Sequence, residues 1–237
     1  MLETLKARIQ GFTYLLSHPH QLRWMIIRET RFGQRHRSKR AWVEWQKYDA
    51  NMHISGLRAH PESQQFSSLH IARINILSEM IGSIGKDLEV LDVGCGDGVL
   101  GDPMMKMGNH VTSVELPTVA TLAMKCWAPA IVAGDAEQLA FAAESFDLII
   151  AFEVVEHLWN PASFFDEAYR VLKDKGHLIV ETPEGEGSLY YDSHKHFFTV
   201  ELIEKMLGSR FVSCCFRRLK PTTGAQTPTI ILLLRKS

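Results

Sequence analysis

From residue 87 onward, short β-rich runs alternate with segments of helical periodicity. The runs that predict strands are 88–93, 110–115, 130–134, 146–152 and 176–181. Between them, 116–126 and 161–172 repeat apolar side chains every three or four residues, as amphipathic helices do. Strands joined through helices are parallel neighbours, so this alternation predicts an α/β fold, a mainly parallel sheet covered by helices on both faces.

The alternation of predicted strands and helices ends near the C-terminus. A polar loop is expected over 182–192, followed by a helix over 199–207 with Thr199 as its N-cap. The connection between the last two predicted strands, 211–217 and 229–234, runs through 220–228 and has no helical pattern. A connection that short permits only an antiparallel pair.

The first 86 residues are expected to be helical, with an apolar stripe over 2–16 and an amphipathic helix over 69–84. Charge divides the chain unevenly. Residues 1–48 hold ten Lys and Arg against three Asp and Glu, and 49–237 hold 16 against 24. We therefore predict two parts, a basic helical extension or lid over 1–65 and a Rossmann-like domain over 66–237.

Three glycines follow the first predicted strand, in the stretch V-L-D-V-G-C-G-D-G over 90–98. Glycine loops after strands bind nucleotides, and 96–101 also fits the dinucleotide pattern G-x-G-x-x-G. Residues 92–102 carry three aspartates, two of them Asp92 and Asp97, and no lysine or arginine. These acids would repel a pyrophosphate but would stabilise the ammonium and sulfonium groups of S-adenosylmethionine. The charge favours S-adenosylmethionine over NAD.

Three more acids stand at the ends of the following predicted strands. Glu115 is placed to accept hydrogen bonds from ribose hydroxyls, and Asp135 from the adenine amino group. Glu153 follows the fourth strand, beside the expected reaction centre. Each acid alone is also explained as a helix cap or a solvated strand end. Together they lie where open α/β sheets bind ligands.

With these residues, the chain resembles the class I S-adenosylmethionine-dependent methyltransferases, in their small-molecule branch of the ubiquinone-biosynthesis type (methyltransferase types 11 and 23). The resemblance rests on residues 90–98, 111–115, 133–137, 146–158 and 170–183, and it covers about 70–235. It implies a seven-stranded sheet of order 3-2-1-4-5-7-6 with strand 7 antiparallel. The turn D-K-G at 174–176 departs from the family's Pro-Gly-Gly.

The resemblance also implies a cofactor, S-adenosyl-L-methionine, with S-adenosyl-L-homocysteine as the product. The predicted cofactor-binding residues are Asp92, Gly94, Cys95, Gly96, Gly98, Glu115, Leu116, Asp135, Ala136, Glu137, Phe152 and Glu153. Methyl transfer requires positioning above all, and a base where the acceptor is a hydroxyl.

Histidine suits the role of that base, and His157, His194 and His196 are the predicted catalytic residues. In the family, an E-H pair after strand 4 borders the active site, and an H-x-x-F-F-T-like segment after strand 5 walls the acceptor pocket. His157 and His194 match these positions. Packing at a helix start also explains His157. No metal is predicted, since His194 and His196 have no nearby cysteine pair or third ligand.

We hypothesise O-methylation of a small molecule, with His194 or His196 as general base. N- or C-methylation, a lipid-like acceptor, and a non-catalytic S-adenosylmethionine-binding module stay open. A nucleic-acid substrate is disfavoured, because the catalytic part carries a balance of −8 and no Asn-Pro-Pro-Tyr-type motif follows strand 4.

The basic segment 1–48 favours either a lid or weak contact with a membrane surface, an anionic acceptor or an acidic partner. The four cysteines include no C-x-x-C pair, and no apolar run approaches about 20 residues. With no secretory signal pattern at the first residues, we predict a cytoplasmic protein, with peripheral membrane contact as an alternative. The sequence predicts neither the acceptor nor the oligomeric state.

Overall fold

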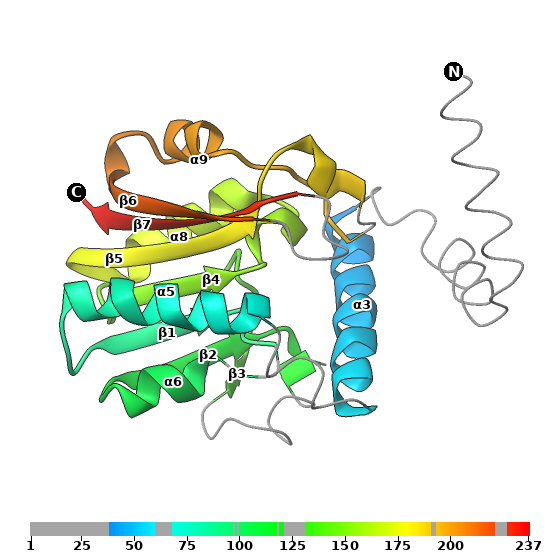
Figure 1. Cartoon of the computed structure of the whole chain (residues 1–237). Helices are drawn as coiled ribbons and strands as arrows, with labels where there is room; N and C mark the ends of the chain where they lie inside the picture. The colour runs from blue at the N-terminus through cyan, green and yellow to red at the C-terminus, as the bar shows by residue number, and fades with distance from the viewer. Residues whose placement is uncertain are drawn as a thin grey trace, which may run out of the picture. The chain divides into compact units, whose positions relative to one another are not determined.

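The structure is a computed structural model, drawn in Figure 1. It describes residues 38–59, 68–96, 98, 100–117, 119–120, 131–190, 193–220 and 227–237. The expected stripe over 2–16, Asp97 and most of the expected helix over 116–126 lie outside these residues. The chain divides into two compact units, Met1–Trp45 and Gln46–Ser237. The boundary between 65 and 66 stays a prediction.

The second unit contains a seven-stranded sheet of order β3-β2-β1-β4-β5-β7-β6. Its strands are β1 (Glu89–Val93), β2 (His110–Glu115), β3 (Ile131–Ala133), β4 (Phe146–Phe152), β5 (Leu172–Pro183), β6 (Phe211–Leu219) and β7 (Thr229–Lys236). The pairs from β3 to β5 are parallel, whereas β7 is antiparallel to both β5 and β6. The predicted strand order and the antiparallel C-terminal pair are confirmed.

Helices cover both faces of the sheet (Figure 1). On one face lie α5 (Ser68–Ile84) and α6 (Gly101–Lys106), and on the other α8 (Pro161–Val171) and α9 (Val200–Leu207). The remaining helical elements are α3 (Lys39–Ala59) and the 3-10 turns η2 (Val155–His157), η3 (Glu186–Tyr190) and η4 (Gly208–Arg210). In the described part of the chain, no helix has both the length and the apolar character needed to cross a membrane.

The core is built from the alternation of side chains along the central strands. Leu91 and Ile149 face the core beneath α8 and α9, whereas their neighbours Val90 and Leu148 face the core beneath α5. All four are fully buried. Because both faces are covered, the central strands have the continuous apolar sequences of parallel strands. The buried acids of these strands, Asp92 and Glu181, lie near the carboxyl ends, which meet at one edge of the sheet.

The start of β5 differs from the sequence prediction. We expected a turn over 173–176 and a strand from Gly176, but α8 ends at Val171 and β5 begins at Leu172. The pairing of β4 with β5 then shifts register between Phe146 and Leu148, and Lys175 has a left-handed φ of 61°. Leu172 pairs with Phe146 and His177 pairs with Leu148, so the residues of the expected turn lie between two paired positions. They form an irregularity within β5 rather than a turn before it.

Candidate active site

The glycine loop leaves the carboxyl end of β1 in a conformation that favours glycine. Gly94, Gly96 and Gly98 have φ values of 70°, 56° and 80°. The Gly94 amide donates to the Val114 carbonyl at 2.8 Å, which ties the loop to β2. A Cβ atom on Gly94 would lie 2.4 Å from Cγ2 of Val154. The absence of a side chain at this position lets the loop pass close to the segment after β4.

Glu115, the last residue of β2, is bonded to this loop. One carboxylate oxygen accepts from the Gly96 amide at 3.0 Å, and the other accepts from the Leu116 amide at 2.6 Å. Burial raises the pKa of Glu115, and the two backbone hydrogen bonds oppose that shift. Each oxygen retains a lone pair beyond the one used here, so the carboxylate can hold the loop and still accept bonds from a ligand.

The other predicted cofactor residues lie around the same edge. Asp92 is 2% exposed near the end of β1, and Cys95 and Phe152 are also buried. Asp135 follows β3, and its carboxylate accepts from the Glu137 amide at 2.9 Å. The Glu137 carboxylate accepts from the Trp159 amide at 2.7 Å, so it links the loop after β3 to the segment after β4. Ala136 packs against the core between them.

Glu153 follows β4 and has a left-handed φ of 54°, unusual for a residue with a side chain. Its carboxylate pairs with the Arg73 guanidinium of α5 at 2.5 Å. The same guanidinium pairs with the carboxylate of Glu181 in β5 at 2.6 Å. Arg73 therefore joins the carboxyl ends of two neighbouring strands to a helix on one face of the sheet.

The electrostatics of this group follow from its burial. Burial raises the pKa of Glu181 to about 8, with the Glu153 charge adding to the shift and Arg73 opposing it. Burial alone would lower the pKa of Arg73, but the charges of Glu181 and Glu153 outweigh it and raise that pKa. Arg73 is therefore charged at neutral pH and donates to both carboxyl groups.

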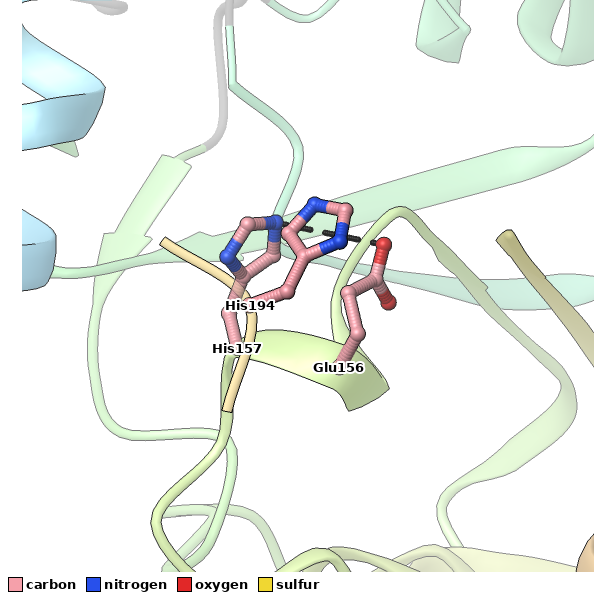
Figure 2. A group of neighbouring side chains, drawn as sticks. All are labelled: Glu156, His157 and His194. Carbon is pink, nitrogen blue, oxygen red and sulfur yellow. Dashed lines mark ion pairs between the residues drawn. The ribbon is translucent and has the colours of Figure 1, made fainter. Parts of the chain in front are cut away.

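Two of the predicted histidines lie together, and Glu156 lies beside them (Figure 2). The His157 and His194 rings meet edge to face, with centroids 4.8 Å apart. Nε2 of His157 is 3.9 Å from a carboxylate oxygen of Glu156. Nδ1 of His157 lies 2.8 Å from the Ser193 carbonyl. A carbonyl only accepts, so Nδ1 carries the hydrogen and Nε2 of the neutral ring keeps its lone pair.

His196 is not part of this group. Its ring lies against Phe198 with centroids 6.3 Å apart. The segment carrying His194 and His196 is anchored from its backbone, since the Lys195 and His196 amides both donate to the Glu156 carbonyl, at 2.8 and 3.2 Å. Burial lowers the pKa of His194 to about 4 and also lowers the pKa of His196. Both rings are therefore neutral at pH 7.

Sequence reasoning missed three residues of this site: Arg73, Glu156 and Glu181. Glu181 ends a predicted strand, so the rule that selected Glu115, Asp135 and Glu153 also selects Glu181. Glu156 stands within the quoted E-V-V-E-H run, next to a predicted histidine. Arg73 had no local signal, because its role depends on where α5 packs against the sheet.

A mainly parallel sheet of this order, with a glycine loop after β1 and acids at or near the carboxyl ends of β1 to β4, is typical of the Rossmann-like fold of class I methyltransferases. The family comparison agrees. Residues 91–180 match the family described as "Methyltransferase domain". This part of the chain is therefore similar to the methyltransferase domains of S-adenosylmethionine-dependent methyltransferases.

Among curated relatives, a ubiquinone biosynthesis O-methyltransferase of Azorhizobium caulinodans is 37% identical over 103 residues, 41% of this chain and 41% of the relative. The chain spans between 35% and 52% of the length of the curated relatives it matches.

Solved structures share the fold. The N-methyltransferase NodS of Bradyrhizobium japonicum has a TM-score of 0.63 at 18% identity, covering 77% of this chain and 97% of that one. The 1,6-didemethyltoxoflavin-N1-methyltransferase of Burkholderia thailandensis has a TM-score of 0.62 at 19% identity, covering 82% and 89%.

Proposed function

We propose that the chain transfers the methyl group of S-adenosylmethionine to a hydroxyl oxygen of a small-molecule acceptor, with a histidine receiving the hydroxyl proton. The fixed ring of His157 carries this proposal. Its Nδ1 donates to the Ser193 carbonyl at 2.8 Å, which directs the Nε2 lone pair away from that carbonyl. A general base needs such a lone pair on an oriented ring.

The cofactor residues fit the proposed ligand by their chemistry. Asp92 and the loop from Gly94 to Gly98 would hold the amino-acid end, Glu115 the ribose hydroxyls, and Asp135 with Ala136 the adenine. Gly96 supports this assignment, because no described atom lies within 4 Å of where its Cβ would be. When bound, S-adenosylmethionine supplies a methyl group on a positively charged sulfur. The acids at this edge favour that charge over a phosphate.

His157 suits the base better than the other two histidines. The pKa of His194, about 4, makes its imidazole a poor proton acceptor at neutral pH. Nε2 of His196 is buried and has no hydrogen-bond partner in the described part of the chain, so bulk solvent and an acceptor do not reach it there. Our assignment of the base therefore moves from His194 or His196 to His157, with His194 packing against it.

Turnover of methyl-labelled S-adenosylmethionine with a panel of hydroxylated small molecules tests the proposal. We expect labelled methyl ethers, and a decrease of kcat of about 10²–10⁴-fold for His157→Gln, the range for loss of a general base. His110→Gln is the matched control, since that exposed histidine on β2 pairs with Asp87. Unchanged kcat in His157→Gln, or label recovered on nitrogen or carbon, would overturn the assignment.

The basic segment 1–48 lies mostly outside the described residues. We propose from its charge that it gives weak contact with an anionic surface. Co-sedimentation of the full chain with anionic vesicles, at low and high salt, tests this contact. Equal recovery with neutral vesicles would remove the electrostatic contribution and leave the lid as the explanation.

A further inference from the structure

We propose that Gln46 of α3 is a positioning residue that fixes the ring of His157 through the Ser193 carbonyl. The side-chain amide of Gln46 donates from Nε2 to this carbonyl at 2.9 Å. Nδ1 of His157 donates to the same oxygen at 2.8 Å. Gln46 and Ser193 are 147 residues apart in the sequence and belong to the same compact unit. The contact therefore ties the N-terminal end of this unit to the proposed base.

The chemistry of the three groups decides how these two bonds are made. A carbonyl oxygen accepts and never donates, and it has two lone pairs. The Gln46 amide therefore presents its NH₂ group, and the His157 ring presents Nδ1–H. Both distances lie in the ordinary range for N–H···O hydrogen bonds. The Ser193 carbonyl is thus shared by one side chain from α3 and one from η2, and both of its lone pairs are used.

The segment that carries this carbonyl is held further along by different bonds. The Lys195 and His196 amides donate to the Glu156 carbonyl, at 2.8 and 3.2 Å. These bonds attach the segment to η2, the same turn that carries His157. Among the described contacts of the Ser193 carbonyl, only the bond from Gln46 comes from outside the segments after β4 and β5. It therefore holds the carbonyl independently of the ring.

The position of this carbonyl decides which ring nitrogen of His157 carries the hydrogen. A neutral imidazole can place its hydrogen on either nitrogen, and the bond made by one nitrogen selects the form. While the carbonyl faces Nδ1, the lone pair stays on Nε2. Without that acceptor, the form with hydrogen on Nε2 also becomes populated, and it has no lone pair there to receive a proton.

The same contact also supports the neighbouring ring. His194 follows Ser193 directly, and its ring meets the His157 ring edge to face with centroids 4.8 Å apart (Figure 2). A shift of the Ser193 peptide would therefore move the His194 backbone as well. One hydrogen bond from Gln46 thus stabilises both the hydrogen position and the packing of the His157 ring.

The consequence for catalysis rests on the proposed function, although the effect on the ring does not. In the proposed reaction, the hydroxyl proton passes to Nε2 of His157 while the methyl group moves from sulfur to oxygen. Gln46 takes no part in these bonds. Removing its donor should therefore lower kcat through His157 alone and leave KM for S-adenosylmethionine unchanged.

Nitrogen-15 NMR of the full chain, labelled at histidine, measures the ring directly. Spectra are recorded at about pH 8.5, where an ordinary imidazole is neutral, and the His157→Gln spectrum identifies the His157 signals. We expect the parent to have hydrogen on Nδ1 and none on Nε2. Gln46→Met has a side chain of similar length without a donor, and it should shift both signals toward the opposite form. Neither cofactor nor acceptor is present, so the result stands if the proposed methyl transfer fails.

Two further variants make this test specific. Gln138→Met is the matched control, because it makes the same substitution at an exposed glutamine, and it should leave the His157 signals as in the parent. Gln46→Glu has nearly the same shape as glutamine, but its carboxylate cannot donate to the carbonyl. It should shift the signals at least as far as Gln46→Met. Unchanged His157 signals in both Gln46 variants, or hydrogen on Nε2 in the parent, would overturn the proposal.

A double-mutant cycle on kcat tests the route of the effect, with an acceptor from the panel of hydroxylated molecules. Gln46→Met should lower kcat by about fivefold, the ratio that corresponds to one neutral hydrogen bond. In the His157→Gln background, the same substitution should change kcat by less than about twofold, because the ring on which it acts is gone. Equal decreases in both backgrounds would show that Gln46 acts by another route and would refute the proposal. If no molecule of the panel is methylated, the proposed function fails, and the NMR result alone decides the role of Gln46.

Discussion

Arg73 and Glu153 form an ion pair of 2.5 Å between the helix that precedes the sheet and the residue that follows its fourth strand. Glu181 accepts from the same guanidinium and is 0% exposed. The pair therefore belongs to a partly buried network, with Glu153 35% exposed, in which one arginine bonds with two carboxyl groups. Such networks contribute little when intact but are costly to break, because the remaining charge is left in the interior.

We expect Arg73→Met to lower the free energy of unfolding by about 3 kcal/mol, the typical cost of removing one partner from a buried ion pair. Urea denaturation of the parent and the variant measures the difference. The matched control is Arg217→Met, since that arginine pairs with Glu79 on the surface. Its stability should stay close to the parent value. Equal effects of the two substitutions would contradict a special role for the buried network.

Gly94→Ala should destabilise the domain for two separable reasons. A left-handed φ of 70° is strained for alanine, and the new Cβ would lie 2.4 Å from Cγ2 of Val154. Strain and overpacking together predict a loss of about 3 kcal/mol. Gly108→Ala has a similar φ of 86° with no described atom within 4 Å, so it should lose only about 1 kcal/mol.

A double-mutant cycle with Val154→Ala separates the two causes. Removing the valine methyl groups should recover the part of the loss that comes from overpacking, while the strain remains. Thermal unfolding of the four proteins gives the coupling. A Gly94→Ala variant as stable as the parent would show that the loop moves away from Val154.

The sheet could be predicted because each part of its pattern has a local cause. Central strands such as β4 are covered on both faces, so their sequence is mostly apolar, and the connection before β7, which has no helical sequence pattern, permits only an antiparallel pair. The start of β5 could not be predicted in this way. Whether 172–175 continue a strand depends on their pairing with β4, which the local turn residues do not encode.

In the candidate site, too, features with a local sequence signal could be predicted, whereas contacts that depend on packing could not. Glu115, Asp135 and Glu153 were predicted from their positions at strand ends. The ion pair of Glu153 with Arg73 was not, because the two residues are brought together only by the packing of α5. Likewise, the E-H pair marked His157, but only the fold shows that His194, from the segment after β5, meets it edge to face.

Glu115→Gln should weaken binding of S-adenosylhomocysteine while keeping the volume of the side chain. Both carboxylate oxygens accept from backbone amides, those of Gly96 and Leu116. A glutamine amide must turn its NH₂ group toward one of these donors in either orientation, which loses a charge-assisted hydrogen bond of about 1.5–3 kcal/mol. We expect Kd to rise by about tenfold or more, measured by calorimetry.

Asp147→Asn is the control for Glu115→Gln. Asp147 is also an acid of a central strand, but it stands near the amino end of β4 and bonds with Lys173 and the Glu89 amide. Its substitution should leave Kd unchanged. A rise of Kd in both variants would point to a loss of fold rather than a loss of the proposed ribose site.

Glu167→Gln should lower the free energy of unfolding at neutral pH. It should also remove part of the decrease of that free energy in acid. The Glu167 carboxylate accepts from Arg170 and from the Leu139 amide, and Arg170 in turn donates to the Leu139 and Phe141 carbonyls. Bonding with Arg170 lowers the pKa of Glu167 below its ordinary value of 4.5, with burial opposing that shift. The side chain is 20% exposed. We therefore expect a loss of about 1 kcal/mol, discounted for solvent screening.

The sign of the pH dependence follows from that lowered pKa. The stabilisation by Glu167 is fully present above pH 4.5, the unfolded value, and is lost as pH falls through the lower folded value. The difference in unfolding free energy between parent and Glu167→Gln should be largest at pH 7 and should shrink below pH 4.5. Denaturation at several pH values measures it, with the exposed Glu204→Gln as control. A difference that stays constant below pH 4.5 would mean that the carboxylate charge does not stabilise the contacts of Glu167 with Arg170 and the Leu139 amide.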